Sequence, residues 1–129
     1  GIPASLTLAQ AALESGWGAR APGFNLFGIK AGKSWTGPTV TFDTHEHLDG
    51  KDVALADRFR RYSSWLDSME DHARLLMTDH YAACRRETTG TGWARAVAAA
   101  GYATDPKYAD KLTSIIRDYN LAHYDQVHA

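Results

Sequence analysis

Several features that mark special classes of protein are scarce in this sequence. Its 129 residues include one cysteine, and 14 basic residues nearly balance 15 acidic ones. A single cysteine cannot form an internal disulfide, and we interpret Cys84 as a buried thiol in a helical segment. The uncharged runs are shorter than the roughly 18 residues of a membrane-spanning helix, so we expect no membrane segment. The balanced charge argues against a dedicated nucleic-acid-binding surface.

Glutamate is also scarce. Eleven of the 15 acidic residues are aspartate, and the glutamates lie at positions 14, 46, 70 and 87. Glu70 and Glu87 fall in helical segments with no motif around them, and we interpret them as surface residues. A mechanism that needs a glutamate therefore has two main candidates, Glu14 and Glu46.

What is present favours a single folded domain over residues 1–129. Hydrophobic residues make up 44% of the chain, with four Trp, six Tyr and four Phe available for a core. A domain of this size buries roughly two-thirds of its unfolded surface. Because the chain begins at Gly1 rather than at Met, we expect it to be part of a longer protein.

Periodicity predicts a mainly helical α+β fold. Apolar spacing indicates helices over residues 2–15, 64–78, 80–87, 93–100 and 105–120, with a turn over 88–92 and Asp105 as the last N-cap. Strand-like alternation over 39–43 and 54–62 flanks an Asp-Gly turn within 48–51, which predicts an antiparallel hairpin. Two such lobes commonly leave a cleft between them.

Glu14 has the position expected of a general acid. It falls in the last turn of the first helix, where the negative end of the helix dipole disfavours a second negative charge. Trp17 and the apolar run before Glu14 would add desolvation, which also favours the neutral acid. A carboxyl protonated near neutral pH suits proton donation. An ordinary surface glutamate at a helix end is the alternative on position alone.

Other groups allow more than one interpretation. His45 and His47 would share one face of a strand and resemble a metal-binding pair, but no third ligand has a matching spacing, so we expect a solvated hairpin and no metal. Arg58, Arg60 and Arg61 fit a solvated strand face, with binding of anionic substrate groups as the alternative. Sugar stacking is an option for the four tryptophans, although we expect core packing for at least two.

Four segments, in this order and spacing, are similar to one known family. They are AQAALESGWG at 9–18, NLFGIK at 25–30, FRRYSS at 59–64 and GYATDPKYADKL at 101–112. The combination resembles glycoside hydrolase family 73, the bacterial peptidoglycan β-N-acetylglucosaminidases, and among them the members that act in flagellar rod assembly. The family usually begins with a further helix, so we expect this chain to be trimmed at its N-terminus.

The resemblance implies a lysozyme-like fold, with an α lobe, a small β lobe at about 36–62 and a sugar-binding groove between them. It implies that Glu14 is the general acid and that Glu46, in Thr44-His-Glu-His47, is the second catalytic carboxyl, although His47 replaces the family's tyrosine. Tyr102 matches a tyrosine that assists at the cleaved sugar. Further candidates for substrate binding are Trp17, Asn25 and Tyr62.

The implied reaction is hydrolysis of the β-1,4 bond between N-acetylglucosamine and N-acetylmuramic acid, opening the wall for the flagellar rod. Inverting, retaining and substrate-assisted mechanisms stay open, the last with Tyr102 positioning the acetamido group. Alternatives are a muramidase or lytic transglycosylase on the same fold, or a non-catalytic wall-binding module. We expect peptidoglycan strands and rod proteins as partners, no nucleic acid, membrane or cofactor, and a periplasmic, wall-associated location.

Overall fold

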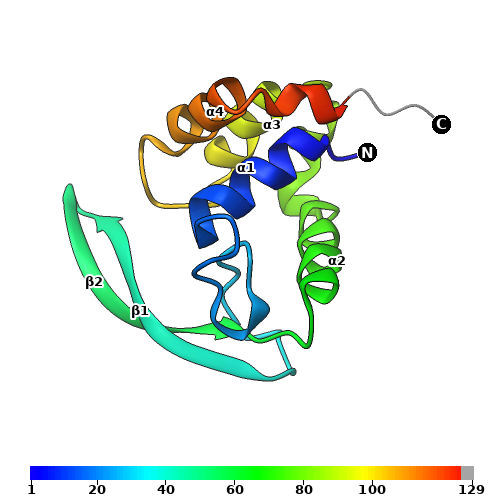
Figure 1. Cartoon of the computed structure of the whole chain (residues 1–129). Helices are drawn as coiled ribbons and strands as arrows, with labels where there is room; N and C mark the ends of the chain where they lie inside the picture. Colours follow the sequence, from blue (N-terminus) through cyan, green and yellow to red (C-terminus); the bar gives the residue numbers. More distant parts are fainter. Residues whose placement is uncertain (126–129) are drawn as a thin grey trace.

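The computed structural model describes residues 1–125 and consists of a helical lobe with a long β-hairpin curving along one side of it (Figure 1). Within these residues no helix is long and apolar enough to cross a membrane. In chain order the elements are α1 (Ala4–Ser15), the 3-10 turn η1 (Pro22–Phe24), β1 (Thr39–Leu48), β2 (Lys51–Arg60), α2 (Trp65–Leu76), η2 (Asp79–Arg86), α3 (Gly90–Ala99), α4 (Tyr108–Asp118) and η3 (Leu121–Asp125).

The helical lobe is held by one apolar core. α1 packs against α3, α4 and η3, and α3 also packs against α4. The fully buried side chains of this core include Leu6, Leu76, Val97 and Leu112, together with Trp93 and the thiol of Cys84. Burial raises the pKa of Cys84, which keeps the thiol protonated and confirms its interpretation as a buried thiol.

The hairpin forms where the sequence predicts it, with longer strands. Leu48 pairs with Lys51, so the loop consists of Asp49 and Gly50, which both have positive φ angles of 51° and 76°. A two-residue turn of this kind matches the twist of antiparallel strands and favours Asp-Gly. The register then places Glu46 opposite Val53.

Several contacts join the hairpin to the helical lobe near its base. Asp71 of α2 accepts hydrogen bonds from Tyr62 Oη at 2.5 Å and Arg60 Nη1 at 2.9 Å. Lys30 forms an isolated bridge with Phe59 of β2. These contacts fix the end of β2 against the body, and the rest of the hairpin extends from that point.

The fold class is confirmed, and three local predictions are corrected. α3 begins at Gly90 rather than after a turn over 88–92, because Thr89 caps it by accepting a hydrogen bond from the Gly92 amide. α4 begins at Tyr108, two residues later than predicted, and Asp105 instead caps the preceding turn through the Lys107 amide. Of the four tryptophans only Trp93 is buried in the described part of the chain.

Candidate active site

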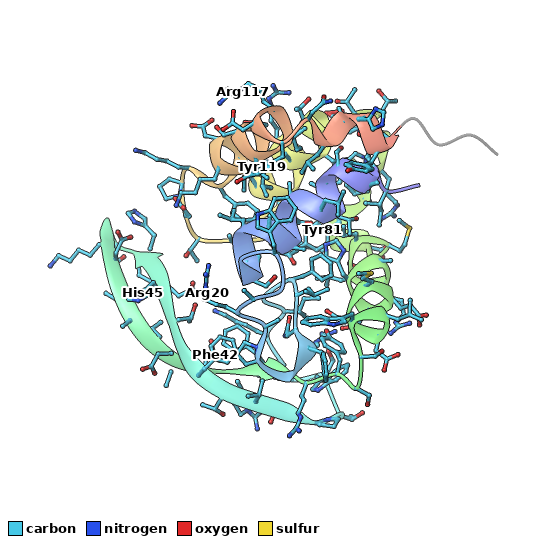
Figure 2. All side chains as sticks on the ribbon, in the orientation of Figure 1. Arg20, Phe42, His45, Tyr81, Arg117 and Tyr119 are labelled. Atoms are coloured by element: carbon cyan, nitrogen blue, oxygen red, sulfur yellow. The ribbon has the colours of Figure 1, made fainter. Side chains whose placement is uncertain are left out.

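A cleft of about 420 Å³ lies between the hairpin and the helical lobe. The end of α1, the loop around Gly28, the inner face of the hairpin and the loop after α3 all line it. Phe42 lies on the inner side of the hairpin, facing the helical lobe (Figure 2). Glu14 and Glu46 both line this cleft, from opposite lobes. The structure therefore brings together the two glutamates that the sequence analysis singled out.

Glu14 is held in a desolvated position. Its burial, together with the negative charge of Glu46, raises its pKa from 4.5 to about 7, although a hydrogen bond from Tyr108 and the charge of Lys111 lower it in part. Gly28 has a φ of 66°, and a Cβ added there would lie 3.4 Å from Glu14 Oε1. The loop backbone thus covers the carboxyl group, which is neutral for part of the time at pH 7.

A buried chain of hydrogen bonds ends on Glu14. His72 Nε2 lies 2.8 Å from Gln10 Oε1, Gln10 Nε2 donates to Tyr108 Oη at 3.1 Å, and Tyr108 Oη donates to Glu14 Oε2 at 3.4 Å. Burial lowers the pKa of His72 to about 4, so its imidazole is neutral. The amide of Gln10 assigns the tautomer, because its oxygen needs a donor and the Nε2–H of His72 is the group in reach.

The direction of this chain decides where Glu14 carries its proton. Tyr108 donates to Oε2, and that oxygen therefore accepts. Because the carbonyl oxygen of a carboxylic acid is a better acceptor than its hydroxyl oxygen, this contact favours the proton of the neutral acid on Oε1, the oxygen near Gly28 of the cleft wall. The buried chain leaves Glu14 able to donate into the cleft.

Glu46 is placed by an ion pair rather than by burial in apolar surroundings. Its Oε1 lies 2.7 Å from Lys30 Nζ, and Lys30 also contacts Asp57 Oδ2 at 3.2 Å. The two carboxylates raise the pKa of Lys30 against the effect of its burial. The backbone amide of Arg58 lowers the pKa of Asp57 most, and Lys30 lowers it further. The two cleft glutamates thus differ in environment: Glu14 is desolvated, whereas Glu46 is paired with a cation.

Tyr102 lines the cleft, but its hydroxyl already has a partner. The hydroxyl donates to the carbonyl oxygen of Phe27 at 2.8 Å, and the ring stacks on Tyr108 with centroids 5.8 Å apart. Burial raises the pKa of Tyr102 well above its usual value. Tyr102 therefore stays protonated and connects the loop after α3 to the loop that covers Glu14.

The three predicted substrate-binding residues differ in how they lie relative to the cleft. The ring of Trp17 is half exposed, packs edge-on against Tyr119 at 5.1 Å and is not among the cleft-lining residues. Tyr62 is buried and bound to Asp71, and both burial and this bond raise its pKa. Neither residue faces the cleft that Glu14 lines.

Asn25 touches the cleft, yet its amide is fully used by backbone groups. Its Nδ2 donates to the carbonyl oxygens of Ile29 and Arg60, both at 2.9 Å, and its Oδ1 accepts from the amides of Phe27 and Ile29. No donor or acceptor of the side chain remains for a sugar. Asn25 shapes the loop that carries Gly28.

The hairpin tip also reaches the helical lobe. The amide of His47 donates to Thr104 Oγ1 at 3.0 Å, and its Nδ1 lies 3.0 Å from Asp52 Oδ1. No group of three or more potential metal ligands occurs in the described residues. The Thr104 contact bridges the cleft between β1 and the loop after α3.

Sequence reasoning missed the residues that act on the two glutamates. They are Gln10, His72 and Tyr108 behind Glu14, and Lys30 and Asp57 beside Glu46. Three of them, Gln10, Lys30 and Tyr108, lie inside the quoted motifs, which was the available signal. Their partners are 16 to 98 positions away in the chain, so spacing alone could not pair them.

A cleft with one desolvated and one ion-paired carboxyl, on facing lobes, is the arrangement of a glycoside hydrolase. The comparison with known families agrees: residues 1–121 match the glucosaminidase model, described as mannosyl-glycoprotein endo-beta-N-acetylglucosaminidase. The chain belongs to this glucosaminidase family of glycoside hydrolases.

Individual relatives support the assignment. The peptidoglycan hydrolase FlgJ of Salmonella typhimurium is 46% identical over 125 residues, covering 91% of this chain and 40% of that protein. The exo-glucosaminidase LytG of Bacillus subtilis is 38% identical, with 95% and 46% covered. The chain spans less than half the length of these curated relatives.

Solved structures share the fold. A peptidoglycan hydrolase mutant from Sphingomonas sp. A1 has a TM-score of 0.87 at 42% identity, covering 96% of this chain and 85% of that one. A C-terminally truncated glycoside hydrolase domain of Salmonella typhimurium FlgJ has a TM-score of 0.72 at 44% identity, with 93% and 85% covered.

The desolvation of Glu14 predicts that it destabilises the folded protein at high pH. The pKa of Glu14 is about 7 in the folded protein, against a reference value of 4.5 for the unfolded chain. Between these pH values the folded state therefore binds a proton that the unfolded state has released. The free energy of unfolding therefore falls as pH rises from about 4.5 to 7 and is level above that. At pH 8 the free energy of unfolding of Glu14→Gln, measured by urea denaturation, should exceed that of the wild type by about 2 to 3 kcal/mol. At pH 4 the two free energies should be equal.

Glu70→Gln is the matched control, because Glu70 is exposed on α2. It should follow the wild type at both pH values. Equal stability of Glu14→Gln and the wild type at pH 8 would show that Glu14 is not desolvated.

The saturated amide of Asn25 predicts that Asn25→Asp costs stability rather than only substrate affinity. The change keeps the shape but removes both donors and places a carboxylate against two carbonyl oxygens. We expect the free energy of unfolding to fall by about 2 to 4 kcal/mol. Asn120→Asp, at an exposed position, should change it little. Unchanged stability with weakened sugar binding would return Asn25 to the binding surface.

Proposed function

We propose that this domain hydrolyses the β-1,4 bond between N-acetylglucosamine and N-acetylmuramic acid in peptidoglycan. Membership of the glucosaminidase family supports the bond, and the peptidoglycan hydrolases among its relatives support the polymer. The observation that carries the proposal is Glu14, a carboxyl of pKa about 7 that lines a cleft of about 420 Å³ opposite Glu46. The cleft lining combines polar and apolar surface, as sugar binding requires.

Glu14 acts as the general acid. Its Oε1 proton passes to the glycosidic oxygen as the bond from that oxygen to the anomeric carbon of N-acetylglucosamine breaks. The leaving sugar departs as a neutral alcohol, and Glu14 is left as a carboxylate. The Tyr108 hydroxyl on Oε2 then stabilises this new charge, because a hydrogen bond to a carboxylate is stronger than one to the neutral acid.

Glu46 supplies the negative charge that faces the opening bond. Paired with Lys30, it acts as the base that deprotonates the attacking water and stabilises positive charge at the anomeric carbon. Water adds its oxygen to that carbon and gives one proton to Glu46. Glu46 then releases this proton to solvent, and solvent returns one proton to Glu14, so both carboxyls regain their starting states. Tyr102 holds the loop around Phe27 in place and presents its ring to the sugar.

The wider setting is also part of the proposal. The FlgJ relatives of Salmonella typhimurium and Escherichia coli suggest that the full-length protein opens the periplasmic cell wall during flagellar assembly. Rod proteins would then bind outside the domain described here. The autolysin of Enterococcus faecalis is 42% identical over 134 residues, which supports wall hydrolysis as the activity shared across these settings.

Digestion of purified sacculi tests the assignment. Glu14→Gln should lose activity by about 10²- to 10⁴-fold, the usual contribution of a general acid, whereas Glu70→Gln should retain it. Glu46→Gln should be reduced rather than abolished. Zymography gives the rates, and mass spectrometry should find new reducing N-acetylglucosamine ends.

Anhydro-muramic ends would instead identify a lytic transglycosylase, and reducing muramic ends a muramidase. Equal clearing by Glu14→Gln and the wild type would exclude Glu14 as the acid. Binding of sacculi without any new ends, from the wild type, would favour a wall-binding module.

The pKa of Glu14 also predicts the pH profile. Only the protonated acid is active, so kcat/KM should fall as pH rises through about 7. Tyr108→Phe removes a hydrogen bond that lowers this pKa, and the falling limb should move to higher pH. A limb that stays in place in Tyr108→Phe would mean that Glu14 does not set it.

A further inference from the structure

Three basic side chains line the cleft, and two of them are already paired. Lys30 contacts Glu46 and Asp57, and Arg60 is bound by the buried carboxylate of α2. The third is Arg20, which makes no ion pair with any residue from 1 to 125. Arg20 is therefore the basic side chain of the cleft lining that has no carboxylate partner among residues 1–125.

The backbone after α1 places Arg20 in this position. Gly16 ends α1 in the left-handed conformation with φ of 58°, and the Arg20 amide donates to the carbonyl oxygen of Ser15 at 2.7 Å. The guanidinium folds back over Gly16, where a Cβ would lie 2.8 Å from three of its atoms. Arg20 lies in the space between α1 and the hairpin (Figure 2). A glycine at 16 is thus required for the observed packing.

The chemistry of a guanidinium indicates its ligand. It offers a planar fork of N–H donors that matches a carboxylate, and it stays charged at every relevant pH. A polymer of N-acetylglucosamine alone has no anionic group. In peptidoglycan every second sugar carries a lactyl ether, whose carboxyl is either free or extended by a peptide that has carboxylates of its own.

We propose that Arg20 binds a carboxylate of the muramic-acid substituent and so selects peptidoglycan over neutral glycans. The inference rests on the proposed function, because it assumes a glycan strand in this cleft with the scissile bond between Glu14 and Glu46. Arg20 lies six residues after Glu14, on the same wall, and contacts the substituent rather than the reacting bond. It determines specificity and takes no part in proton transfer.

The test compares Arg20→Ala with the wild type on soluble peptidoglycan strands in two forms, one native and one with its carboxyl groups converted to amides. On native strands Arg20→Ala should raise KM about tenfold, as expected for one accessible charge-assisted hydrogen bond, with kcat within about twofold. On amidated strands the two proteins should have equal KM values. Arg20→Lys should lie between them on native strands.

Arg95→Ala is the matched control, because Arg95 is exposed on α3 and is not among the cleft-lining residues, while its loss changes net charge equally. It should match the wild type on both strands. A third substrate, stripped of its peptides but keeping the lactyl carboxylate, separates the two sources. If Arg20→Ala still raises KM about tenfold on these strands, Arg20 binds the lactyl carboxylate. If the increase disappears, Arg20 binds a carboxylate of the peptide.

An equal loss on native and amidated strands, or no loss on either, would overturn the inference while leaving the hydrolase assignment intact. Failure of the hydrolase assignment would appear separately, as a wild type that releases no new ends from any strand. In that case the binding affinities of two variants are compared, Glu14→Gln alone and Glu14→Gln combined with Arg20→Ala. Each is measured on native and on amidated strands. Equal affinities there would also overturn the inference.

Discussion

The desolvation of one carboxyl group governs the arrangement of the cleft. Glu14 would be an ordinary acid at the end of a helix, but the loop backbone at Gly28 closes over it and Tyr108 contacts it from behind. Its pKa rises to about 7 because burial removes water from the charged form, an effect that the Tyr108 hydrogen bond and the charge of Lys111 offset only in part. Residues outside the first helix hold the covering loop in place. Asn25 shapes the loop, and Tyr102 fixes it to the segment after α3.

The second carboxyl of the cleft, that of Glu46, lies in a different environment. Glu46 lies on a strand that extends away from the helical lobe, and Lys30 forms an ion pair with it. Asp57 shares that lysine, so the ion pair also joins the two strands to the loop. The resulting division, a neutral acid on one lobe and a carboxylate on the other, follows from environment, since both residues are glutamate. The hairpin contributes because it is anchored at its base by Asp71 and at its tip by Thr104.

The sequence predicts those parts of the structure whose causes are local. The Asp49-Gly50 turn and the helix end after Glu14 each depend on residues within a few positions, and both are observed. Glu14 itself could be chosen from helix position before any family was considered. The hydrogen-bond chain behind it could not, because Gln10, His72 and Tyr108 meet only once three helices have packed.

In the loop motif 25–30, the roles of two residues differ from those that the resemblance implies. The resemblance placed Asn25 among the substrate-binding residues, and Lys30 had no role. In the structure the amide of Asn25 has all of its hydrogen-bonding groups occupied by backbone, whereas Lys30 touches the second carboxyl of the cleft. A motif residue can therefore serve the site in either of two ways, by fixing backbone or by meeting a functional group. Counting the donors and acceptors that remain unused distinguishes them. By that criterion Asn25 is structural and Lys30 belongs to the site. Arg20, which no motif singled out for binding, is the basic cleft residue without a carboxylate partner among residues 1–125.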